Sequence, residues 1–469
     1  MNLFRTKPAS PAAFCDSGLK RCLGAFDLTF MGIGAIIGTG IFVLTGIAAA
    51  VYSGPAVIIS FILAGLASGF AALAYAELAA SVGGSGSAYG YSYAAFGEII
   101  AWMVGWDLIL EYAVSVAAVA NGWSGYFENA LTAIGLGLPA ALTKAPSMGG
   151  IINLPASLII LMLMVLLIIG VRESARVNVA MVFVKLLTIT VFIAVAGFNV
   201  HPENWTPFIP FGWFEHADDG RPIGILAGAS IVFFAYVGFD AVSTAVEEAR
   251  NPQRDVPIGI IASLIICTLI YIVVSGLLTG VVSYTKLNVS SPVAYSLQLL
   301  GYNWASALVA TGVITGLTTV MLVLYYALTR IIFAMSRDGL LTAKLARVHP
   351  NTKTPVRIIV ICGVVISLVA GLVPLGELAE LVNIGTLAAF VLVSLGVIVL
   401  RMRQPDLPRP FKNPFGYTLP ILGILSCGAL MMFLPVVTWI RFLGWLAIGM
   451  VIYFAYSYRH SHLGAEPKA

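Results

Sequence analysis

The sequence predicts an all-α protein that crosses a membrane many times. Of its 469 residues, 59% are hydrophobic and only 10% are charged, and the mean hydropathy is +0.97. A soluble globular domain has about half apolar and about a quarter charged residues. The apolar residues gather into runs of about twenty, the length that a helix needs to cross the hydrocarbon core. Lysine and arginine concentrate in alternate connections between these runs, as they do in polytopic membrane proteins.

Twelve apolar runs are long enough to be transmembrane helices. A further segment, 283–303, is only moderately apolar and is expected to hold a short surface helix on the outer side. The predicted spans are 25–51, 55–80, 98–131, 152–171, 176–198, 224–248, 256–282, 304–335, 355–374, 378–402, 418–437 and 439–458.

The charge distribution predicts the orientation of these spans. With the N-terminus inside, 19 of the 25 lysines and arginines fall in inside segments, four in outside loops and two within spans. Cytoplasmic loops of membrane proteins carry such an excess. We therefore expect both termini in the cytoplasm and a location in the plasma membrane. The net charge of +4 reports this topology and does not indicate nucleic-acid binding.

The spans predict a division of the chain into a core of ten helices and an accessory pair. Five spans in each half of the core would turn the second half upside down, which is the arrangement of an inverted repeat. The expected parts are a cytoplasmic segment 1–24, the core 25–402 with its halves 25–198 and 224–402, and the accessory helices with the tail, 403–469.

A glycine-rich run predicts a break in the first span. Gly32, Gly34, Gly38 and Gly40 stand close together around the polar Thr39, and each glycine costs a helix interior about 1 kcal/mol against alanine. The run lacks the spacing and the βαβ context of a dinucleotide-binding fingerprint. A GxxxG motif for helix packing is one interpretation. An unwound helix whose amides face a substrate carboxylate is the other, and it is favoured by the extra glycines. The binding residues would then be Ile36, Ile37, Gly38, Thr39 and Gly40.

The sixth span contains the matching interruption that an inverted repeat requires. Its sequence from 233 to 240 combines small residues, Gly238 and the acidic Asp240 within an apolar helix. If Phe234, Ala235 and Val237 lose their helical partners, their carbonyls can accept hydrogen bonds from a substrate ammonium group. Together the two breaks would hold the two charged ends of an α-amino acid.

Charged residues within spans are costly and are therefore functional hypotheses. Lys185 lies in the middle of span five, where a buried lysine can alternate between charged and neutral forms and so carry a proton. A permanently paired structural lysine is the alternative. Glu111 of span three could face the cavity and pair with Lys185 or with a cationic substrate side chain, whereas Asp107, four residues earlier, is expected to be structural.

The inner end of span six carries an acidic stripe, Asp240, Glu247 and Glu248, for which a salt-bridge network at an inner gate or a solvated helix end are the two interpretations. Arg330 of span eight is expected to pair with one of these acids. In the middle of the same span, Met321, with Thr318 and Thr319, is expected to form a wall of the substrate site.

Other kinds of site find no support in the sequence. The five histidines lie in loops or in the tail, and the five cysteines are scattered without a CxxC pair. Neither pattern indicates a metal centre, no P-loop for ATP occurs, and no cofactor is expected. The spans are too apolar for a channel lining, and no catalytic cluster at membrane depth indicates an enzyme.

The sequence resembles the cationic amino acid transporter branch of the amino acid–polyamine–organocation superfamily, and within it the bacterial amino acid permeases. The resemblance covers nearly the whole chain and rests on the motifs at 34–42, 77–78, 88–91, 105–112, 234–240, 247–252 and 336–341.

This resemblance implies a leucine-transporter-like fold of five plus five spans with two more appended, and alternating access. It places the substrate carboxylate on the backbone around Ile37 to Gly40, and the amine on the carbonyls of the sixth-span break. Lys185 matches the family's lysine that stands where sodium-coupled relatives bind an ion, which implies proton coupling. Glu111 matches the family's span-three glutamate. Animal members of the branch have fourteen spans, so the resemblance does not single out arginine.

The expected function is secondary transport of L-amino acids, cationic or small and neutral, such as arginine, lysine or alanine, with proton symport across the lipid bilayer. An exchanger without net proton movement and a non-transporting amino acid sensor remain open. A small membrane-protein partner is also left open. The protein is not expected to be an enzyme.

Overall fold

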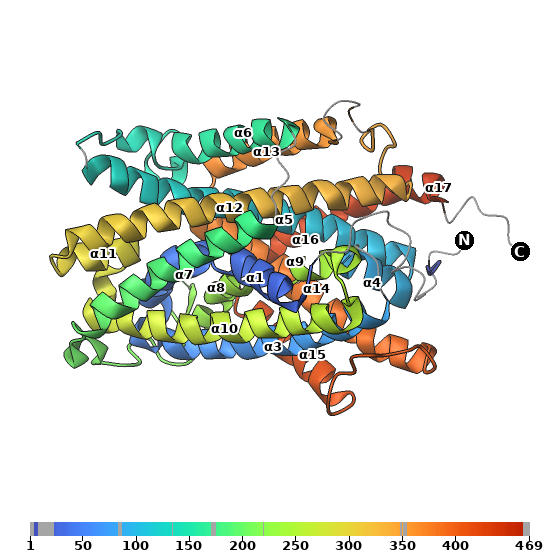
Figure 1. The fold of residues 1–469 in the computed structure, drawn as a ribbon, viewed down its shortest axis with the longest axis horizontal. Coiled ribbons are helices and arrows are strands. Elements are labelled where there is room, and N and C mark those ends of the chain that lie inside the picture. The colour runs from blue at the N-terminus through green and yellow to red at the C-terminus, as the bar shows by residue number, and fades with distance from the viewer. Residues whose placement is uncertain are drawn as a thin grey trace, which may run out of the picture.

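The computed structural model describes residues 4–7, 23–82, 87–133, 135–169, 175–218, 220–347, 349 and 354–462. Within them the chain is helical apart from loops, one isolated β-bridge and one short hairpin. The hairpin pairs two strands of two residues each, β1 (Glu215–His216) and β2 (Pro222–Ile223). The long helices run mostly along the long axis of the molecule (Figure 1). The predicted segment 1–24 lies largely outside the described residues.

The structure contains α-helices, labelled α, and short 3₁₀- or π-helical segments, labelled η. In the first half they are α1 (Ala25–Ile36), η2 (Gly40–Leu44), α2 (Thr45–Ala48), η3 (Ala49–Ser53), η4 (Gly54–Ala56), α3 (Val57–Ser81), α4 (Ser87–Ala95), α5 (Glu98–Ala133), η5 (Ala140–Leu142), η6 (Pro146–Met148), α6 (Leu154–Ile169), α7 (Ala175–Gly197) and η7 (Pro202–Trp205). In the second half they are α8 (Ile225–Val232), η8 (Phe233–Tyr236), α9 (Ala241–Thr244), η9 (Val246–Glu248), α10 (Pro252–Val281), η10 (Tyr284–Lys286), α11 (Pro292–Leu299), α12 (Asn303–Arg337), α13 (Val356–Leu372), α14 (Leu375–Arg403), α15 (Thr418–Met432), α16 (Val436–Ile452), η11 (Tyr453–Ser457) and α17 (Tyr458–His460).

Eight helical stretches of the described chain are long and apolar enough to cross a membrane, and four shorter apolar helices accompany them. Each predicted span overlaps one of these stretches. The first predicted span is divided between α1 and the start of the stretch Gly40–Ser81, which turns at Gly54 (φ +61°). The segment 283–303 contains a helix, α11, but five of its eight residues are buried, so it is not simply a surface helix. The eight long stretches are Gly40–Ser81, Glu98–Thr132, Val179–Gly197, Ile225–Thr244, Pro252–Val281, Asn303–Arg337, Leu375–Arg403 and Val436–His460, and the shorter helices are α1, α6, α13 and α15.

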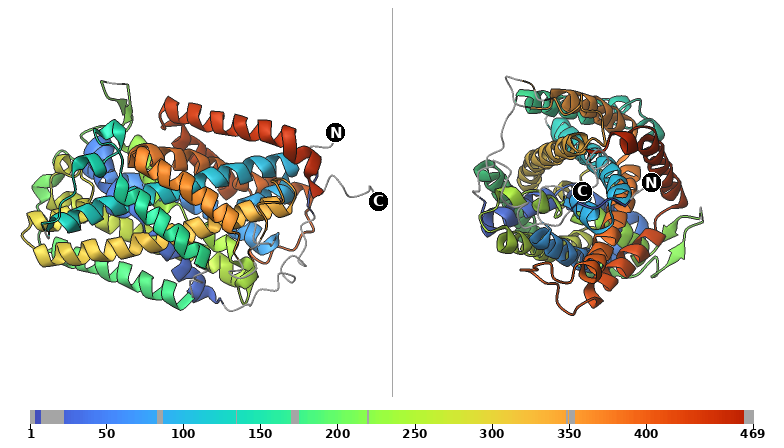
Figure 2. Two further views of the ribbon diagram at one scale, coloured as in Figure 1. Left: turned by 90° about the horizontal axis from the view of Figure 1, so that it is seen from above. Right: turned by 90° about the vertical axis from the view of Figure 1, so that its right-hand side faces the viewer.

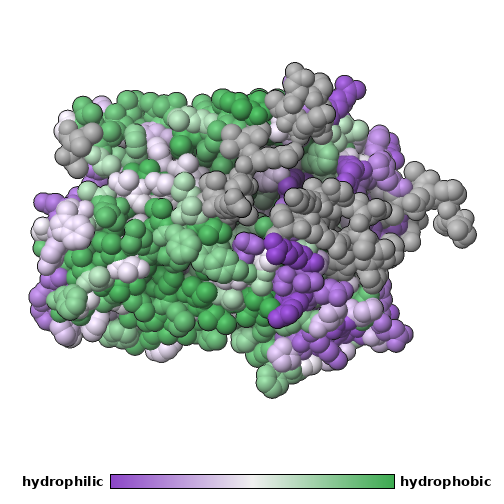
Figure 3. All heavy atoms as spheres, viewed as in Figure 1, coloured by the Kyte–Doolittle hydropathy of each residue, from purple (hydrophilic) through white to green (hydrophobic). Residues whose placement is uncertain are grey.

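Hydrophobic residues cover most of the face shown in Figure 3, and hydrophilic residues gather toward the ends of the molecule, most of all at the end where α17 lies. This is the surface of a helical bundle that stands across a bilayer. The fold is therefore that of an all-helical membrane protein.

The helix after the hairpin lies at the centre of the bundle. In the stretch Ile225–Thr244, 94% of the most apolar window is buried, against 22% in Val436–His460 at the periphery. Helix α10 packs against α3 and α1, and α12 packs against α5 and α7, so these helices surround the centre. The end-on view of Figure 2 shows this arrangement of the helices around the middle of the bundle.

Both predicted helix breaks are present. Helix α1 ends at Ile36, and Ile37 is extended (φ −72°, ψ 97°) before the chain becomes helical again. In the sixth span η8 ends at Tyr236 and Val237 is extended (φ −62°, ψ 133°). Gly238 follows with φ +117°, a conformation that only glycine adopts readily.

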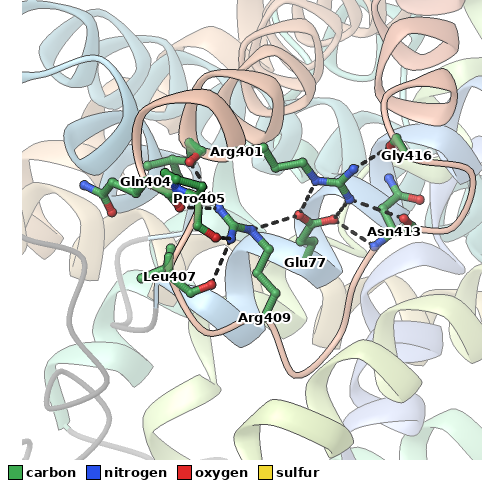
Figure 4. A network of polar contacts seen from close by, with 9 residues as sticks. Glu77, Arg401, Gln404, Pro405, Leu407, Arg409, Asn413 and Gly416 are labelled. Atoms are coloured by element: carbon green, nitrogen blue, oxygen red, sulfur yellow. Dashed lines mark hydrogen bonds and ion pairs between the residues drawn. The ribbon is translucent and has the colours of Figure 1, made fainter.

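A buried ionic network connects the accessory helices to the core at one end of the molecule (Figure 4). Arg401 of α14 donates to both carboxylate oxygens of Glu77 on α3, at 2.9 and 2.5 Å. Arg409 approaches the same carboxylate at 3.7 Å, and the amide of Asn413 donates to it at 2.8 Å. Arg401 also donates to the carbonyl of Gly416. The connection between α14 and α15 is thus tied to α3 through one carboxylate; we refer to these contacts as the Glu77 network.

Candidate functional site

A small cavity lies where the two helix breaks meet, and its volume is about 20 Å³. That is room for about one water molecule. The lining side chains come from α1 and its continuation, from α5, from the sixth-span break and from α12. They are Ala35, Ile36, Gly38, Thr39, Gly40, Ser115, Val119, Phe234, Val237, Val320 and Leu324. Of the predicted binding residues, Ile36, Gly38, Thr39, Gly40, Phe234 and Val237 therefore line the cavity.

The two breaks touch each other directly. A Cβ atom at Gly40 would lie 2.3 Å from Cα and 2.9 Å from the backbone nitrogen of Ala235, so only glycine fits there. Tyr271 of α10 joins the breaks from one side, because its hydroxyl can donate to the carbonyls of Ile36 (2.9 Å) and Ala235 (2.8 Å). Ala235 and the fully buried Ile37 support the cavity without lining it.

Two buried hydroxyl groups in the cavity have no hydrogen-bond partner among the described residues. They belong to Thr39, which is 0% exposed, and Ser115, which is 2% exposed. Most buried polar groups in proteins are hydrogen-bonded. Two free hydroxyls in an otherwise apolar cavity are consistent with a polar ligand that would satisfy them.

Lys185 lies outside the cavity wall, against the first break. Its side chain is 1% exposed, and Nζ donates to the carbonyl of Gly34 at 2.7 Å. Gly316 of α12 makes room for the lysine stem, because a Cβ there would lie 2.9 Å from Cγ and Cε. The lysine therefore contacts the last turn of α1, immediately before the break.

Glu111 does not line the cavity, contrary to our expectation. Ser115, one turn further along α5, does so in its place. Glu111 is 2% exposed and lies with Asp107 and Asp240 in a separate acidic cluster. The reason is the position of the breaks, which lie beside the middle of α5 at Ser115 and Val119 and leave Glu111 one turn away.

Met321 does not line the cavity either. Its neighbour Val320 and Leu324, one turn later, point toward the breaks, whereas Met321 is fully buried within the bundle. Thr318, also expected in the wall, accepts a hydrogen bond from Trp123 Nε1 at 3.0 Å. Helix α12 does contribute to the wall, as predicted, but through the face that carries Val320 and Leu324 and not through the face that carries Met321.

The inner acidic stripe is divided between two environments. Arg330 forms an ion pair with Glu248 at 3.4 Å, as predicted. Asp240 is 1% exposed, and one of its oxygens accepts from the hydroxyl of Tyr112 at 2.8 Å, so it does not belong to a solvated helix end. The side chain of Glu247 lies outside the described part of the structure.

A larger hollow of about 400 Å³ opens on the outer face of the bundle between α7 and α12. Exposed apolar residues such as Leu187 and Leu308 border it, and the hydroxyls of Thr188, Thr311 and Thr315 bond back to their own helices. This groove shares no lining residue with the cavity between the helix breaks. Across the described chain, no group of three histidine, cysteine or acidic residues is arranged to hold a metal ion.

Sequence reasoning missed five lining residues, and for the four on α5 and α12 a signal existed; the fifth is Ala35 of α1. Ser115 and Val119 are four residues apart on α5, and Val320 and Leu324 are four apart on α12. Residues at this spacing share one helix face. Small or branched side chains at that spacing in the spans opposite the breaks could have indicated the wall.

The fold and the site together define a multi-pass helical membrane protein with a cavity between two interrupted helices, an arrangement used by many secondary transporters. The chain belongs to the amino acid permease family, whose model matches residues 23–456. This is a family of transporters, so the protein is not an enzyme, as the sequence predicted.

Three relatives from this family illustrate which transporters the chain is similar to. The branched-chain amino acid permease BcaP of Bacillus subtilis is 52% identical over 470 residues, covering 98% of this chain and 99% of the relative. The methylthioribose transporter of the same species is 49% identical, over 98% and 99% of the two chains. The vacuolar cationic amino acid transporter 4 of Arabidopsis thaliana is 37% identical over 83% of this chain and 64% of its own length.

Proposed function

We propose that the protein is a secondary active transporter of L-amino acids in the plasma membrane. It has twelve spans and both termini in the cytoplasm. The repeats 25–198 and 224–402 form its transport core, and 403–469 adds the accessory helices. The observation that carries the proposal is the small cavity at the contact between two interrupted helices. A membrane protein keeps such breaks only where the freed backbone groups meet protein, water or a ligand.

The two breaks supply complementary groups for the charged ends of an amino acid. The amides at the start of the helical segment after the first break, at Gly38, Thr39 and Gly40, suit a carboxylate, because the first amides of a helix have no intrahelical acceptor. Carbonyls of Phe234 and Val237 suit the ammonium group. The free hydroxyls of Thr39 and Ser115 belong to the same cavity lining and would add hydrogen bonds to the substrate.

The cavity wall favours a neutral aliphatic side chain. Every lining residue is uncharged, and Val119, Val320 and Leu324 present branched alkyl groups. A cationic substrate would need a carboxylate in the wall, and Glu111 lies outside it. Alanine and branched-chain amino acids therefore fit better than arginine, in agreement with the name of the BcaP relative. The other relative is named as a transporter of methylthioribose. That molecule has neither a carboxylate nor an ammonium group, so it would not use the two breaks in the way proposed for an amino acid.

The size of the cavity implies movement during transport. A volume of about 20 Å³ does not hold an amino acid. Substrate binding therefore requires the broken helices to separate from α5 and α12, which is the motion of alternating access.

Lys185 is proposed as the proton carrier because it contacts the helix that must move. Its ammonium group donates to the carbonyl of Gly34, one turn before the break. Loss of its proton would weaken this bond, so protonation and the position of α1 would depend on each other.

The test is uptake of labelled leucine, alanine and arginine into proteoliposomes, with and without an inward proton gradient. We expect leucine and alanine uptake to be stimulated, and Lys185→Met to lose the stimulation. Lys144→Met, at an exposed loop lysine, is the matched control and should behave as the wild type.

Other results would support a different function. Uptake that ignores the gradient but rises with internal amino acid would indicate an exchanger. Tight binding of leucine without flux would indicate a sensor. Stimulated uptake of arginine alone would contradict the neutral specificity.

The two free hydroxyls allow a separate test of the binding site. Thr39→Val and Ser115→Ala remove hydroxyls that have no partner in the described structure, so we expect little change in stability. A hydrogen bond to a charged ligand is worth about 1.5–3 kcal/mol, so each variant should bind leucine about 10–100-fold more weakly. Isothermal titration calorimetry and thermal unfolding in detergent measure the two effects.

The control for this test shows the opposite pattern. The hydroxyl of Ser230 donates to the carbonyl of Leu430 at 2.7 Å, away from the cavity. Ser230→Ala should therefore lower stability without changing leucine affinity. Unchanged affinity in both Thr39→Val and Ser115→Ala would remove these hydroxyls from the substrate site.

A further inference from the structure

Three carboxylic acids lie close together in the core, apart from the cavity and from Lys185. Asp107 and Glu111 are four residues apart on one face of α5. Asp240 lies directly before α9, in the inner half of the interrupted sixth span. Their side chains are 4%, 2% and 1% exposed. We call these three residues the acidic cluster.

Neighbouring helices hold the cluster from several sides. Tyr112 donates its hydroxyl to Oδ2 of Asp240 at 2.8 Å. On α14, Gly385 leaves space for Asp107, because a Cβ there would lie 2.6 Å from Oδ1. The next residue, Thr386, is fully buried and faces the carboxyl of Glu111. The cluster therefore bridges α5, α14 and the sixth span.

The cluster has more acceptors than hydrogens. Oδ1 of Asp107, Oε2 of Glu111, Oδ1 of Asp240 and the hydroxyl of Thr386 are all buried without a hydrogen-bond partner in the described part of the chain. A buried oxygen left in this state costs about 1–3 kcal/mol, and more if it is charged. Added hydrogens on the carboxyls would let these oxygens bond to one another.

Among the described residues, the surroundings of the cluster supply no compensating positive charge in an ion pair. The titratable groups that face it are tyrosines: Tyr75 of α3 lies near all three carboxyls, and Tyr91 of α4 and Tyr112 of α5 lie near Asp240. The ion pairs found among the described residues include none of the three acids. An uncompensated buried carboxylate is very costly, and adjacent carboxyl groups cannot all be ionised.

We propose that Asp107, Glu111 and Asp240 form a proton-binding site, separate from Lys185, whose proton occupancy changes with the position of the inner half of the sixth span. The ligand is the hydrogen ion, taken up by a carboxylate oxygen from the aqueous side that is open and released to the other side. The proposal deepens the proposed proton-coupled transport and rests on it for its role in the cycle.

The geometry explains how movement and proton binding would be coupled. Asp107 and Glu111 stand on the continuous helix α5, whereas Asp240 follows the hinge at Gly238, which packs on the backbone of Ala35 at the first break. Movement at the breaks would carry Asp240 away from α5. Carboxyls held together share protons that they no longer share when apart, so separation favours release of a proton.

Infrared difference spectroscopy tests the site directly, because a protonated carboxyl has a carbonyl band that carboxylates and amides lack. We expect purified wild-type protein to show this band, and leucine binding to change it. Asp107→Asn, Glu111→Gln and Asp240→Asn should each remove or shift it. Glu128→Gln, at a partly exposed acid further along α5, is the matched control and should leave the band unchanged.

Transport gives the second measurement. In Asp107→Asn we expect leucine counterflow at equal pH on both sides to persist, and the stimulation by a proton gradient to fall by about tenfold or more. A band unaffected by all three substitutions would overturn the proposal. So would counterflow and gradient stimulation that fall in parallel, or uptake that requires sodium in place of protons.

The two proposals fail in different ways. If wild-type uptake ignores the proton gradient, proton symport is wrong whatever the variants do. If the gradient stimulates uptake but the carboxyl band is absent from the wild type, symport stands and the acidic cluster is not its proton site.

Discussion

Replacement of Glu77 by glutamine is expected to lower the free energy of unfolding by about 3–5 kcal/mol, the usual effect of removing one partner of a buried ion pair. Arg401 and Arg409 share the carboxylate of Glu77, and the side chains of all three are at most 10% exposed. Glutamine would leave two buried guanidinium groups without a counter-charge and would turn an amide N–H toward Arg401. The accessory helices should then separate from the core at a lower temperature.

Thermal unfolding in detergent, followed by size-exclusion chromatography, measures this effect. The matched control is Glu377→Gln, because Glu377 pairs with Arg441 at 2.6 Å with side chains 38% and 42% exposed. Exposed pairs contribute at most about 1 kcal/mol, so this variant should melt close to the wild type. Equal melting temperatures for Glu77→Gln and Glu377→Gln would show that the Glu77 network does not stabilise the fold.

Gly40→Ala is expected to lose most leucine binding and uptake. The added Cβ would lie 2.3 Å from Cα of Ala235, a backbone atom, so the two breaks would have to move apart. Such overpacking costs about 1–3 kcal/mol of stability. If the separation of the two breaks removes one hydrogen bond to a charged end of the substrate, the affinity for leucine should also fall, by about 10–100-fold.

The control for Gly40→Ala is the same substitution at Gly428 of α15. A Cβ there meets no heavy atom within 4 Å. Alanine favours a helix over glycine by up to about 1 kcal/mol, so Gly428→Ala should bind leucine normally and should be as stable as the wild type or slightly more so. Normal leucine affinity in Gly40→Ala would contradict the close contact of the breaks.

Local sequence was sufficient for the helices and their interruptions. Composition and the length of the apolar runs indicated a helical membrane protein, because a bilayer leaves a spanning chain few other structures. The glycines around Thr39 and the sequence around Gly238 marked both breaks, since glycine weakens a helix wherever it lies. That Arg330 pairs with an acid at the inner end of the sixth span followed from charges placed at the same end of two helices, and the structure shows that this acid is Glu248.

Only the tertiary structure decided which helix faces form the site. Ser115 and Val320 line the cavity, whereas the predicted Glu111 and Met321 do not. In a soluble helix the apolar stripe marks the inward face, but in a bilayer lipid is as apolar as protein, so the pattern does not tell which face turns to the centre.

The polar contacts between distant parts of the chain were also decided only by the tertiary structure. Glu77 meets Arg401 from 324 positions away, and Tyr112 meets Asp240 from 128. No local preference encodes such distant partners. The sequence by itself determined the class of protein, the helices and the two breaks. Tertiary packing determined which side chains line the cavity, which join the helices and which gather in the acidic cluster, because these depend on how distant helices rotate and pack against one another.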